Sequence, residues 1–397
     1  MGTKKVILRP KEARRITNGH LWVFSNEVQS VEGNPRAGDV VDLHAAGGEF
    51  IGRGFYHPHS LITVRLLTRE AEEIDFGFFE RRISAAAALR ARLYPNETTY
   101  RLVHGESDFL PGLVIDRYND IFAIQTYSAG MYNRITLIAD VLQSAIGGFH
   151  PLSIIERNES PLLGLELLPE RSGILRGKET STTITEHGIL YRLDVLKGQK
   201  TGFFLDQREN RYAFRRYVQG CRVLDAFTND GGFALNAAMA GAREVIGLDI
   251  SELAIERAKH NARLNRVADR CTFLVADVFE ELPKLVREVA HQGKFDVINL
   301  DPPALTKSKK NLGAAKHAYK ELNSMALQLL SSGGILATSS CSHHVDDQLF
   351  FETIVSAARQ AHRQIRLLDW RGASPDHPVL STMPETRYLK FAVFVVD

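Results

Sequence analysis

The second half of the sequence alternates short apolar runs with stretches of helical periodicity, and this alternation restricts the fold more than any other feature. Helical patterns cover 251–264 and 319–330. The apolar runs between and around them predict β-strands at 222–226, 244–249, 272–276, 295–300 and 334–339. Strands that alternate with helices form a parallel, doubly wound sheet. Two more apolar runs, 365–369 and 389–396, are expected to close this sheet.

The first half of the sequence has another pattern, which predicts further domains. In residues 5–70, short apolar runs are separated by Gly and Pro, as in a small β-rich domain or barrel. Residues 75–93 have a helical apolar period and are expected to form a connecting helix. An α+β region should follow, with a helix at 135–146 and strands at 113–118, 121–126, 154–157 and 189–195. The length of 397 residues is too great for one core and fits several domains.

Composition excludes several classes of protein. The net charge of +2 argues against a globally basic nucleic-acid binder. No apolar run reaches the ~18 residues of a membrane span, and the basic N-terminus lacks the apolar core of a secretion signal. We therefore expect a cytoplasmic protein without a membrane partner. Three widely spaced cysteines argue against disulfides and zinc, and the adjacent His343 and His344 have no evident third ligand, so no metal is expected.

Acidic residues stand at the ends of four successive predicted strands. They are Asp225, Asp249, Asp277 and Asp301. A single such residue most often belongs to a loop or caps a helix, but four at the ligand-binding edge of a parallel sheet favour a binding site. After the first of these strands, Gly231 and Gly232 would let the backbone approach a ligand beside a helix N-terminus. The segment is not G-x-G-x-x-G, so the dinucleotide-binding fingerprint is absent.

Cys341 is the most informative single residue, because it follows the strand predicted at 334–339. A thiol at the carboxyl end of a strand could attack a substrate. The alternative is a buried structural cysteine, which is the interpretation we prefer for Cys221 and Cys271 near strand starts. No nucleophile elbow accompanies Cys341, so a catalytic triad is not indicated.

At this point the sequence resembles a known family, the 23S rRNA 5-methylcytosine methyltransferases with an N-terminal PUA domain and a single active-site cysteine. The resemblance covers nearly the whole chain and is strongest in the segments 105–118, 200–211, 295–303 and 340–342. It implies an α/β fold in which a Rossmann-like class I methyltransferase domain follows a β-rich PUA domain and a central α+β domain. The implied boundaries are 1–70 for the PUA domain, 71–95 for a linker helix, 96–195 for the central domain and 196–397 for the methyltransferase domain.

The resemblance also implies a function and a set of site residues. The expected reaction is S-adenosyl-L-methionine-dependent formation of 5-methylcytosine in 23S rRNA or its large-subunit precursor, by a chain that could form a homodimer. Cys341 would be the nucleophile, and Asp301 would hydrogen-bond ring nitrogen 3 of the base. The residues expected to bind the cofactor are Asp225, Ala226, Phe227, Thr228, Gly231, Gly232, Asp249, Ile250, Asp277, Val278, Asp301, Gln207 and Arg208. Those expected to bind RNA are Lys307, Lys309, Lys310, Arg14 and Arg15, although a single basic cluster is more often only a solvated surface.

Two departures from the family pattern and three rival functions complete the prediction. Asp230 stands where the family usually has threonine, and Ala304 follows the Asp-Pro-Pro motif where two-cysteine relatives have a second thiol. Methylation of an amino nitrogen usually needs an aromatic residue after this motif, so Ala304 argues against it. Cys341 argues against 7-methylguanine formation. A non-catalytic RNA-binding or ribosome assembly protein is the rival from another class.

Overall fold

The alternating second half of the sequence forms a seven-stranded sheet in the computed structural model of the protein. The strand order is β16-β15-β14-β17-β18-β20-β19. The strands are β14 (Arg222–Ala226), β15 (Glu244–Asp249), β16 (Cys271–Val275), β17 (Phe295–Leu300), β18 (Leu330–Ser340), β19 (Ile365–Arg371) and β20 (Lys390–Val396). The first five of these pair in parallel, whereas β20 is antiparallel to both β18 and β19. The predicted parallel sheet is thus a mixed sheet with an antiparallel edge.

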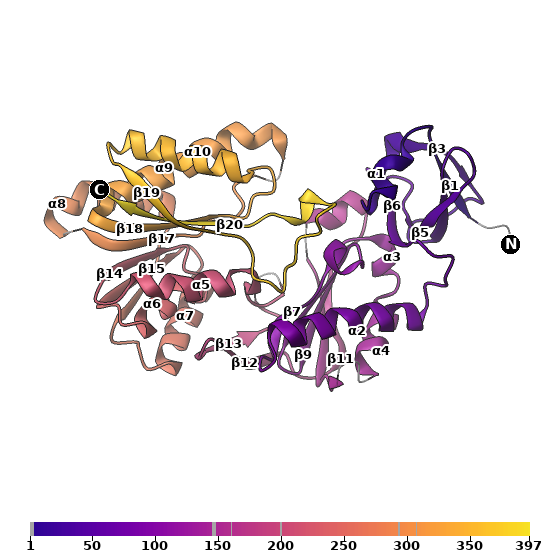
Figure 1. Cartoon of the computed structure of the whole chain (residues 1–397). Coiled ribbons are helices and arrows are strands. Elements are labelled where there is room, and N and C mark those ends of the chain that lie inside the picture. The colour runs from indigo at the N-terminus through magenta and orange to yellow at the C-terminus, as the bar shows by residue number, and fades with distance from the viewer. Residues whose placement is uncertain (1–3, 145–147, 160, 199–200, 293, 307) are drawn as a thin grey trace. The chain divides into compact units, whose positions relative to one another are not determined.

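Helices cover both faces of this sheet, as Figure 1 shows for α9 and α10 on one side and α5, α6 and α7 on the other. The helices are α5 (Arg208–Phe214), α6 (Gly232–Met239), α7 (Glu252–Leu264), α8 (Val278–Gln292), α9 (Leu312–Leu329) and α10 (Asp347–Gln360). Side chains from α9 and α10, such as Tyr319, Leu322 and Phe350, share a buried core with the strands. The doubly wound α/β class is therefore confirmed.

The structure describes residues 4–144, 148–159, 161–198, 201–292, 294–306 and 308–397. These divide into two units, which we describe separately. The first unit holds 1–184, 193–205 and 375–386, and the second holds 185–192, 206–374 and 387–397. Among the described residues, no helix is long and apolar enough to cross a membrane.

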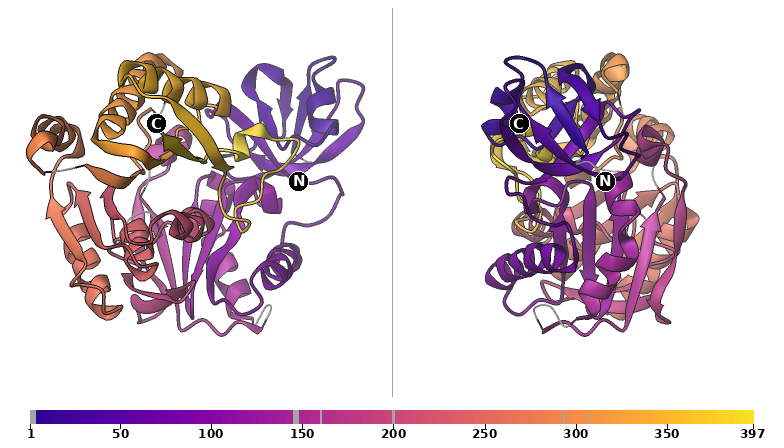
Figure 2. Two further views of the ribbon diagram at one scale, coloured as in Figure 1. Left: turned by 60° about the vertical axis from the view of Figure 1, so that its left-hand side comes forward. Right: turned by 90° about the vertical axis from the view of Figure 1, so that its right-hand side faces the viewer.

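The first unit begins with a six-stranded sheet of order β2-β6-β5-β4-β1-β3. Its elements are β1 (Lys5–Leu8), α1 (Ala13–Thr17), β2 (Trp22–Phe24), β3 (Val28–Glu32), β4 (Val40–His44), β5 (Phe50–Tyr56) and β6 (Ile62–Thr68). In β1, Val6 and Leu8 are buried while their neighbours are partly exposed, as expected for a strand with one face on a core. The β-rich N-terminal region is confirmed, and Figure 2 shows it in two further views.

The rest of the first unit is an α+β layer. Its five-stranded sheet has the order β11-β10-β9-β8-β7. The elements are α2 (Phe76–Leu93), β7 (Thr99–His104), β8 (Leu113–Tyr118), β9 (Ile121–Thr126), α3 (Ala129–Tyr132), α4 (Ile135–Gln143), β10 (Ser153–Asn158) and β11 (Arg171–Gly177). A separate pair is formed by β12 (Ser181–Glu186) and β13 (Ile189–Asp194), of which residues 185–192 are assigned to the second unit. Helix α2 buries Phe78, Phe79 and Ile83 in the core of this layer, so it is an integral part of the layer as well as a connection.

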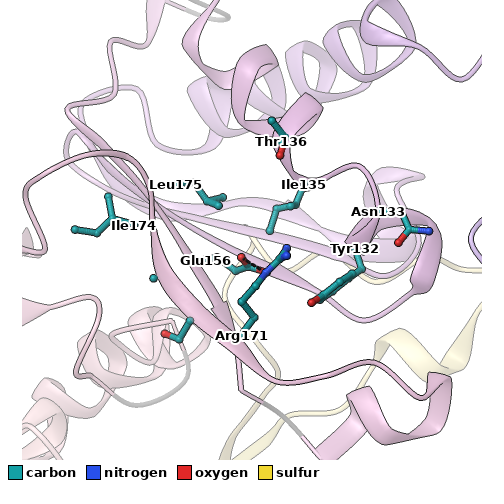
Figure 3. Close-up of a pocket in the computed structure, with 10 residues that line it drawn as sticks. Tyr132, Asn133, Ile135, Thr136, Glu156, Arg171, Ile174 and Leu175 are labelled. Carbon is teal, nitrogen blue, oxygen red and sulfur yellow. Dashed lines mark hydrogen bonds and ion pairs between the residues drawn. The ribbon is translucent and has the colours of Figure 1, made fainter.

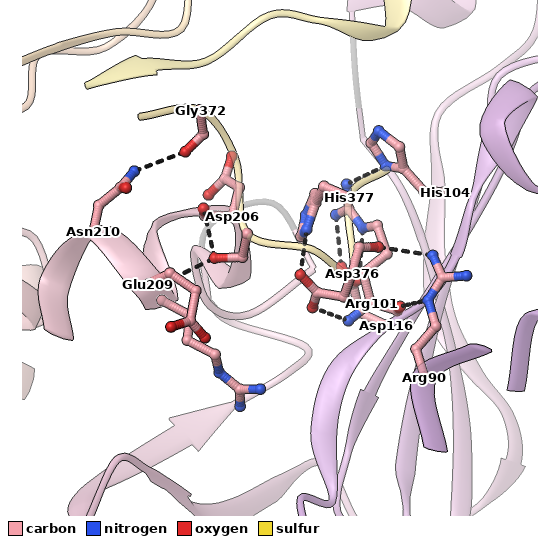
Figure 4. A network of polar contacts seen from close by, with 12 residues as sticks. Arg90, Arg101, His104, Asp116, Asp206, Glu209, Asn210, Gly372, Asp376 and His377 are labelled. Atoms are coloured by element: carbon pink, nitrogen blue, oxygen red, sulfur yellow. Dashed lines mark hydrogen bonds and ion pairs between the residues drawn. The ribbon is translucent and has the colours of Figure 1, made fainter. Parts of the chain in front are cut away.

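Residues 375–386 lie between β19 and β20 in the sequence but belong to the first unit. Met383 is buried in the core of the six-stranded sheet. Arg90 is fully buried, pairs with both carboxylate oxygens of Asp108 and donates to the carbonyl oxygen of Asp376 at 2.7 Å. The Asp376 carboxylate accepts from the backbone N–H of Arg101 and from His377 Nδ1, each at 2.8 Å (Figure 4). This segment therefore completes both the core and the buried charge network of the first unit.

Candidate active site at the carboxyl edge of the second sheet

The loop after β14 is shaped by left-handed backbone and by one buried carboxylate. Phe227, Asn229 and Gly231 have φ values of 67°, 49° and 88°. Asp225 is fully buried beneath them, and its carboxylate accepts from Thr228 Oγ1 at 2.7 Å, from the Ala234 N–H at 2.9 Å and from Asn299 Nδ2 at 2.8 Å. Burial raises the pKa of Asp225 to about 6. These contacts hold the loop and give Asp225 a supporting position.

The glycines and the residues around them leave little room for larger side chains. A Cβ on Gly232 would lie 2.9 Å from Arg211 Cδ. Arg211 in turn makes a buried ion pair with Glu186, with Nη2 2.6 Å from Oε2. The Arg208 Nε lies 3.7 Å from the same carboxylate, so this predicted cofactor residue faces a structural ion pair. Asp230, in the position of the family threonine, accepts from Arg257 Nε at 2.7 Å.

Asp249 ends β15 and fixes two backbone turns at the sheet edge. Its Oδ2 accepts from the N–H of Asn229 at 2.9 Å, and its Oδ1 accepts from the N–H of Ser251 at 2.9 Å. The following residue, Ile250, is 69% exposed. A carboxylate that borders both the glycine loop and an exposed apolar side chain is suited to a ribose diol beside a planar base.

The third strand end supplies more apolar surface. Asp277 Oδ1 accepts from the N–H of Phe279 at 2.9 Å, which is a helix-capping role, and Val278 is buried. Phe279 itself is 41% exposed, and its ring centroid lies 5.9 Å from that of Phe227. Together with Ile250, these two rings form an apolar surface at the carboxyl edge of the sheet, near the Asp249 and Asp277 carboxylates. The acceptor carboxylates and apolar groups present thus fit an adenosine-containing cofactor.

Asp301 follows β17, and its carboxyl group is held by Gln207. Gln207 was expected at this site only because of the family resemblance. Gln207, at the end of the short helix η5 (Leu205–Gln207), donates from Nε2 to Asp301 Oδ1 at 2.9 Å and to Ser339 Oγ at 3.3 Å. Asn210 donates to Gln207 Oε1 at 2.6 Å, which fixes the orientation of the amide. Asn210 also donates to the carbonyl oxygen of Gly372 at 3.0 Å (Figure 4).

Burial raises the pKa of Asp301 to about 7, and the nearby Asp206 and Asp225 carboxylates add to this effect. The carboxyl group is therefore poised to change protonation near neutral pH. Such a value is what a proton-transferring or hydrogen-bond-donating acid in an active site needs.

Cys341 follows β18, which is the neighbour of β17, and the serines on both sides of it make hydrogen bonds to one tyrosine. Leu300 pairs with Thr338, so Asp301 and Cys341 emerge from adjacent parallel strands at one edge. Ser340 Oγ donates to the Tyr319 hydroxyl at 3.0 Å, and the same hydroxyl lies 3.0 Å from Ser342 Oγ. Tyr319 thus fixes the two serines that flank the thiol.

A buried lysine lies beside this thiol and was missed in the sequence. Lys390, on β20, is 2% exposed and donates from Nζ to the carbonyl oxygens of Ser342 at 2.9 Å and Tyr388 at 2.7 Å. Burial lowers its pKa to about 8, and the proximity of the Cys341 sulfur works in the opposite direction. The one available signal was a lysine at the start of the otherwise apolar run 390–396.

The predicted RNA-binding residues lie in both units and differ in exposure and in their partners. In the first unit, Arg14 is exposed, whereas Arg15 donates to both carboxylate oxygens of Glu27 and to the carbonyl oxygen of Trp22, so its guanidinium is used within the fold. In the second unit, Lys310 is exposed and Lys309 begins the short helix η7 (Lys309–Asn311). Lys307 lies outside the described residues.

The other two cysteines differ from their prediction. Cys221 and Cys271 were expected to be buried, but both are partly exposed; Cys271 starts β16 and Cys221 directly precedes β14. Burial nonetheless raises the pKa of Cys271 to about 12, so its thiol is unreactive at neutral pH. Within the described part of the chain, no group of three His, Cys, Asp or Glu side chains is arranged to hold a metal ion.

A doubly wound sheet with a glycine-containing first loop and acids at successive strand ends defines a class I methyltransferase domain. Comparisons with known proteins agree. Residues 172–382 match the family described as S-adenosylmethionine-dependent methyltransferase, and residues 6–69 match the PUA-like domain. The chain therefore belongs to the S-adenosylmethionine-dependent methyltransferase family and carries an N-terminal PUA-like domain, and S-adenosylmethionine is its cofactor.

Relatives of known name cover nearly all of the chain. It is 40% identical to the ribosomal RNA large subunit methyltransferase I of Photobacterium profundum, over 99% of this chain and 100% of that protein. It is also 40% identical to the protein of the same name from Vibrio cholerae, over 96% of both chains. A solved structure from Streptococcus mutans, described as a candidate SAM-dependent methyltransferase, has a TM-score of 0.83 and 22% identity over 98% of this chain and 99% of that one. This last likeness shows the fold.

Proposed function

We propose that the protein is a large-subunit rRNA methyltransferase that forms 5-methylcytosine in 23S rRNA through a covalent bond to Cys341. The names of the relatives support the substrate at the level of large-subunit rRNA. One observation carries the choice of base. The Cys341 thiol and the Asp301 carboxyl follow adjacent parallel strands, so a nucleophile and an acid lie at one edge of the sheet. Carbon 5 chemistry on cytosine needs this pair of groups.

The role of Cys341 follows from the low reactivity of carbon 5 in cytosine. Its thiolate adds to carbon 6, which forms a C–S bond and moves electron density to carbon 5. Carbon 5 can then form a bond to the methyl group that bound S-adenosylmethionine would supply, with the electrons of the broken S–CH3 bond left on the cofactor sulfur. The proton on carbon 5 then leaves to water or to an unassigned base, the C–S bond breaks, and Cys341 departs as a thiolate. If the target base is paired, it must first be turned out of its helix.

Asp301 and Lys390 supply the hydrogen-bond donor and the positive charge that these steps need. A neutral Asp301 carboxyl donates to ring nitrogen 3, where negative charge develops when the thiolate adds. Its pKa of about 7 keeps a substantial neutral fraction at physiological pH. The Lys390 ammonium, held beside the backbone of Ser342, stabilises Cys341 as a thiolate before addition and after expulsion. Gln207 keeps the Asp301 carboxyl in position.

Other residues would hold the cofactor and the RNA. Asp249 would bind the ribose hydroxyls, and Ile250 and Phe279 would flank the adenine. Asp225 and Arg208 would act indirectly, because their charged groups already face protein partners. Arg14 and Lys310, both exposed, would contact RNA phosphates. We also propose the domain boundaries predicted from the sequence. These are 1–70 for the PUA domain, 71–95 for the linker helix, 96–195 for the central domain and 196–397 for the methyltransferase domain.

The test is covalent capture of the substrate. An RNA that carries 5-fluorocytosine at the target should form a stable complex with the wild-type protein, because fluorine cannot leave as a proton. Cys341→Ala should form no covalent complex and should not methylate rRNA. Cys271→Ala, the matched control, should form the complex and methylate rRNA like the wild type. Turnover by Cys341→Ala at the wild-type rate would reject the mechanism and favour methylation of an amino nitrogen or of guanine.

A further inference from the structure

The first unit contains a pocket that the proposed chemistry does not use. It has a volume of about 450 Å³ and lies between the α3–α4 junction and the edge strand β11. Its lining includes Tyr132, Thr136, Arg171, Ser172 and Ile174 (Figure 3). Neither Cys341 nor Asp301, which belong to the other unit, is among the residues that line this pocket.

A buried carboxylate holds the Arg171 side chain in this pocket. Arg171 donates from Nε to Glu156 Oε2 at 2.6 Å, and Glu156 is only 2% exposed. The other Glu156 oxygen accepts from Asn158 Nδ2 at 2.6 Å. Because both oxygens have partners, the carboxylate is fixed, and the guanidinium that it holds has lost much of its rotational freedom.

An aromatic ring supports the same guanidinium from another direction. The Arg171 guanidinium carbon lies 4.5 Å from the centre of the Tyr132 ring. Figure 3 shows the Glu156 carboxylate on one side of the Arg171 guanidinium and the Tyr132 ring on the other. The Arg171 side chain nevertheless remains 45% exposed. The pocket thus presents a planar cation that is held in place and still open to a ligand.

We infer that this pocket binds one unpaired nucleotide of the RNA substrate, with its base stacked on the Arg171 guanidinium. Guanidinium planes stack on exposed bases in single-stranded RNA, and their charge attracts the neighbouring phosphate. The hydroxyls of Thr136 and Ser172 can reach polar edges, and Ile174 offers apolar contact to the sugar or base. The inference rests on the proposed function only in that the substrate is RNA.

Binding of a fluorescein-labelled, unstructured 12-nucleotide RNA by the full-length protein tests this inference. Arg171→Lys keeps the charge but removes the plane, and Thr136→Trp fills the pocket from an exposed position on α4 without touching the ion pair. Each should weaken binding of the single strand by about tenfold, the scale of one lost base stack. Arg176→Lys is the matched control, since it lies on the same strand and pairs with the exposed Asp140. It should bind within about twofold of wild type.

The same RNA annealed to its complement should bind all four proteins with affinities within about twofold, because paired bases cannot enter the pocket. Wild-type affinity in both Arg171→Lys and Thr136→Trp would overturn the inference and leave Arg171 as a structural support of β11. So would a wild-type affinity for the single strand weaker than about 100 µM, the weak end of non-specific binding. Methylation by Cys341→Ala is measured in parallel. Its loss together with unchanged binding by both Arg171→Lys and Thr136→Trp rejects the pocket alone, and the reverse pattern rejects the cytosine mechanism alone.

Discussion

Lys390 reaches across from β20 to Ser342, where its Nζ lies 2.9 Å from the carbonyl oxygen of the residue that follows Cys341. Strand β20 brings it there because Lys390 pairs with Ser340 in the antiparallel register of β18. A buried ammonium beside a nucleophilic thiol costs stability, since burial disfavours its charge. The presence of this lysine in an otherwise apolar strand supports the proposal that it acts on that thiol.

Lys390→Met should raise the pKa of the Cys341 thiol and slow its alkylation by iodoacetamide about tenfold at pH 7.5, the effect of about one pKa unit. The experiment uses a Cys221→Ala, Cys271→Ala background so that one thiol reports. Lys310→Met, which removes an exposed lysine, serves as the control and should leave the rate unchanged. Equal alkylation rates for Lys390→Met and its background would show that the ammonium does not act on the thiol.

Asp301 should make the free energy of unfolding depend on pH. Its pKa is raised to about 7 in the folded protein, so between pH 4 and 7 the folded state holds a proton that the unfolded chain has lost. Its contribution to stability is therefore present at low pH and disappears as the pH rises through 7. Asp301→Asn should gain about 2.5 kcal/mol relative to wild type between pH 5 and pH 8. Urea unfolding at the two pH values measures this, and the exposed Asp269→Asn should show no such gain.

Asp249→Ala should weaken S-adenosylmethionine binding by about one to two orders of magnitude, because charged hydrogen bonds contribute roughly 1.5–3 kcal/mol. Calorimetric titration measures the affinity. Glu256→Ala on α7 removes an exposed carboxylate that pairs with Lys259, and it should bind the cofactor normally. A folded Asp249→Ala protein with wild-type affinity would reject the ribose assignment.

Arg14 and Arg15 are adjacent in sequence but should give opposite phenotypes. Arg14→Ala should weaken RNA binding and reduce the slope of log K against log salt by about 1, while stability stays constant. Arg15→Ala should instead lower the free energy of unfolding by roughly 2–3 kcal/mol, because the Glu27 carboxylate loses its charged partner. Salt titrations and thermal unfolding of both variants distinguish the roles. Point substitutions are preferable to deletion of residues 1–70, since Met383 is packed in that core.

Much of the seven-stranded sheet could be predicted from the sequence, because each of its strands contains a short apolar run that is visible without any information on neighbouring strands. Apolar runs such as 222–226 and 295–300 coincide with β14 and β17. Helix α9 begins at Leu312, seven residues before the predicted start, because its first turns carry Gly313, Ala314 and Lys316 and show little apolar periodicity. The antiparallel return of β20 was also missed, since strand direction depends on a connection that periodicity does not describe.

Some residues of the candidate site could also be predicted from the sequence, and others could not. The acids at strand ends were visible, because a strand and the residue after it are adjacent in sequence. Tyr319 and Lys390 were not, because they reach Ser342 from elements that lie 23 and 48 residues away. The sequence alone predicts Arg15 to be a surface cation, because its partner Glu27, 12 residues later, gives no sign of pairing in the sequence.

Residues 375–386 connect the order of synthesis to the order of folding. Arg90 is fully buried, and one of its acceptors, the Asp376 carbonyl oxygen, is translated 286 residues after it. Until that segment emerges, a buried N–H of Arg90 would lack this acceptor, although its charge is paired with Asp108, and the place of Met383 in an apolar core would be unfilled. A chain that terminates early should therefore be recognised as unfinished by proteases and chaperones. In this way the first unit reaches its mature form only after residues 206–374 of the second unit have been synthesised.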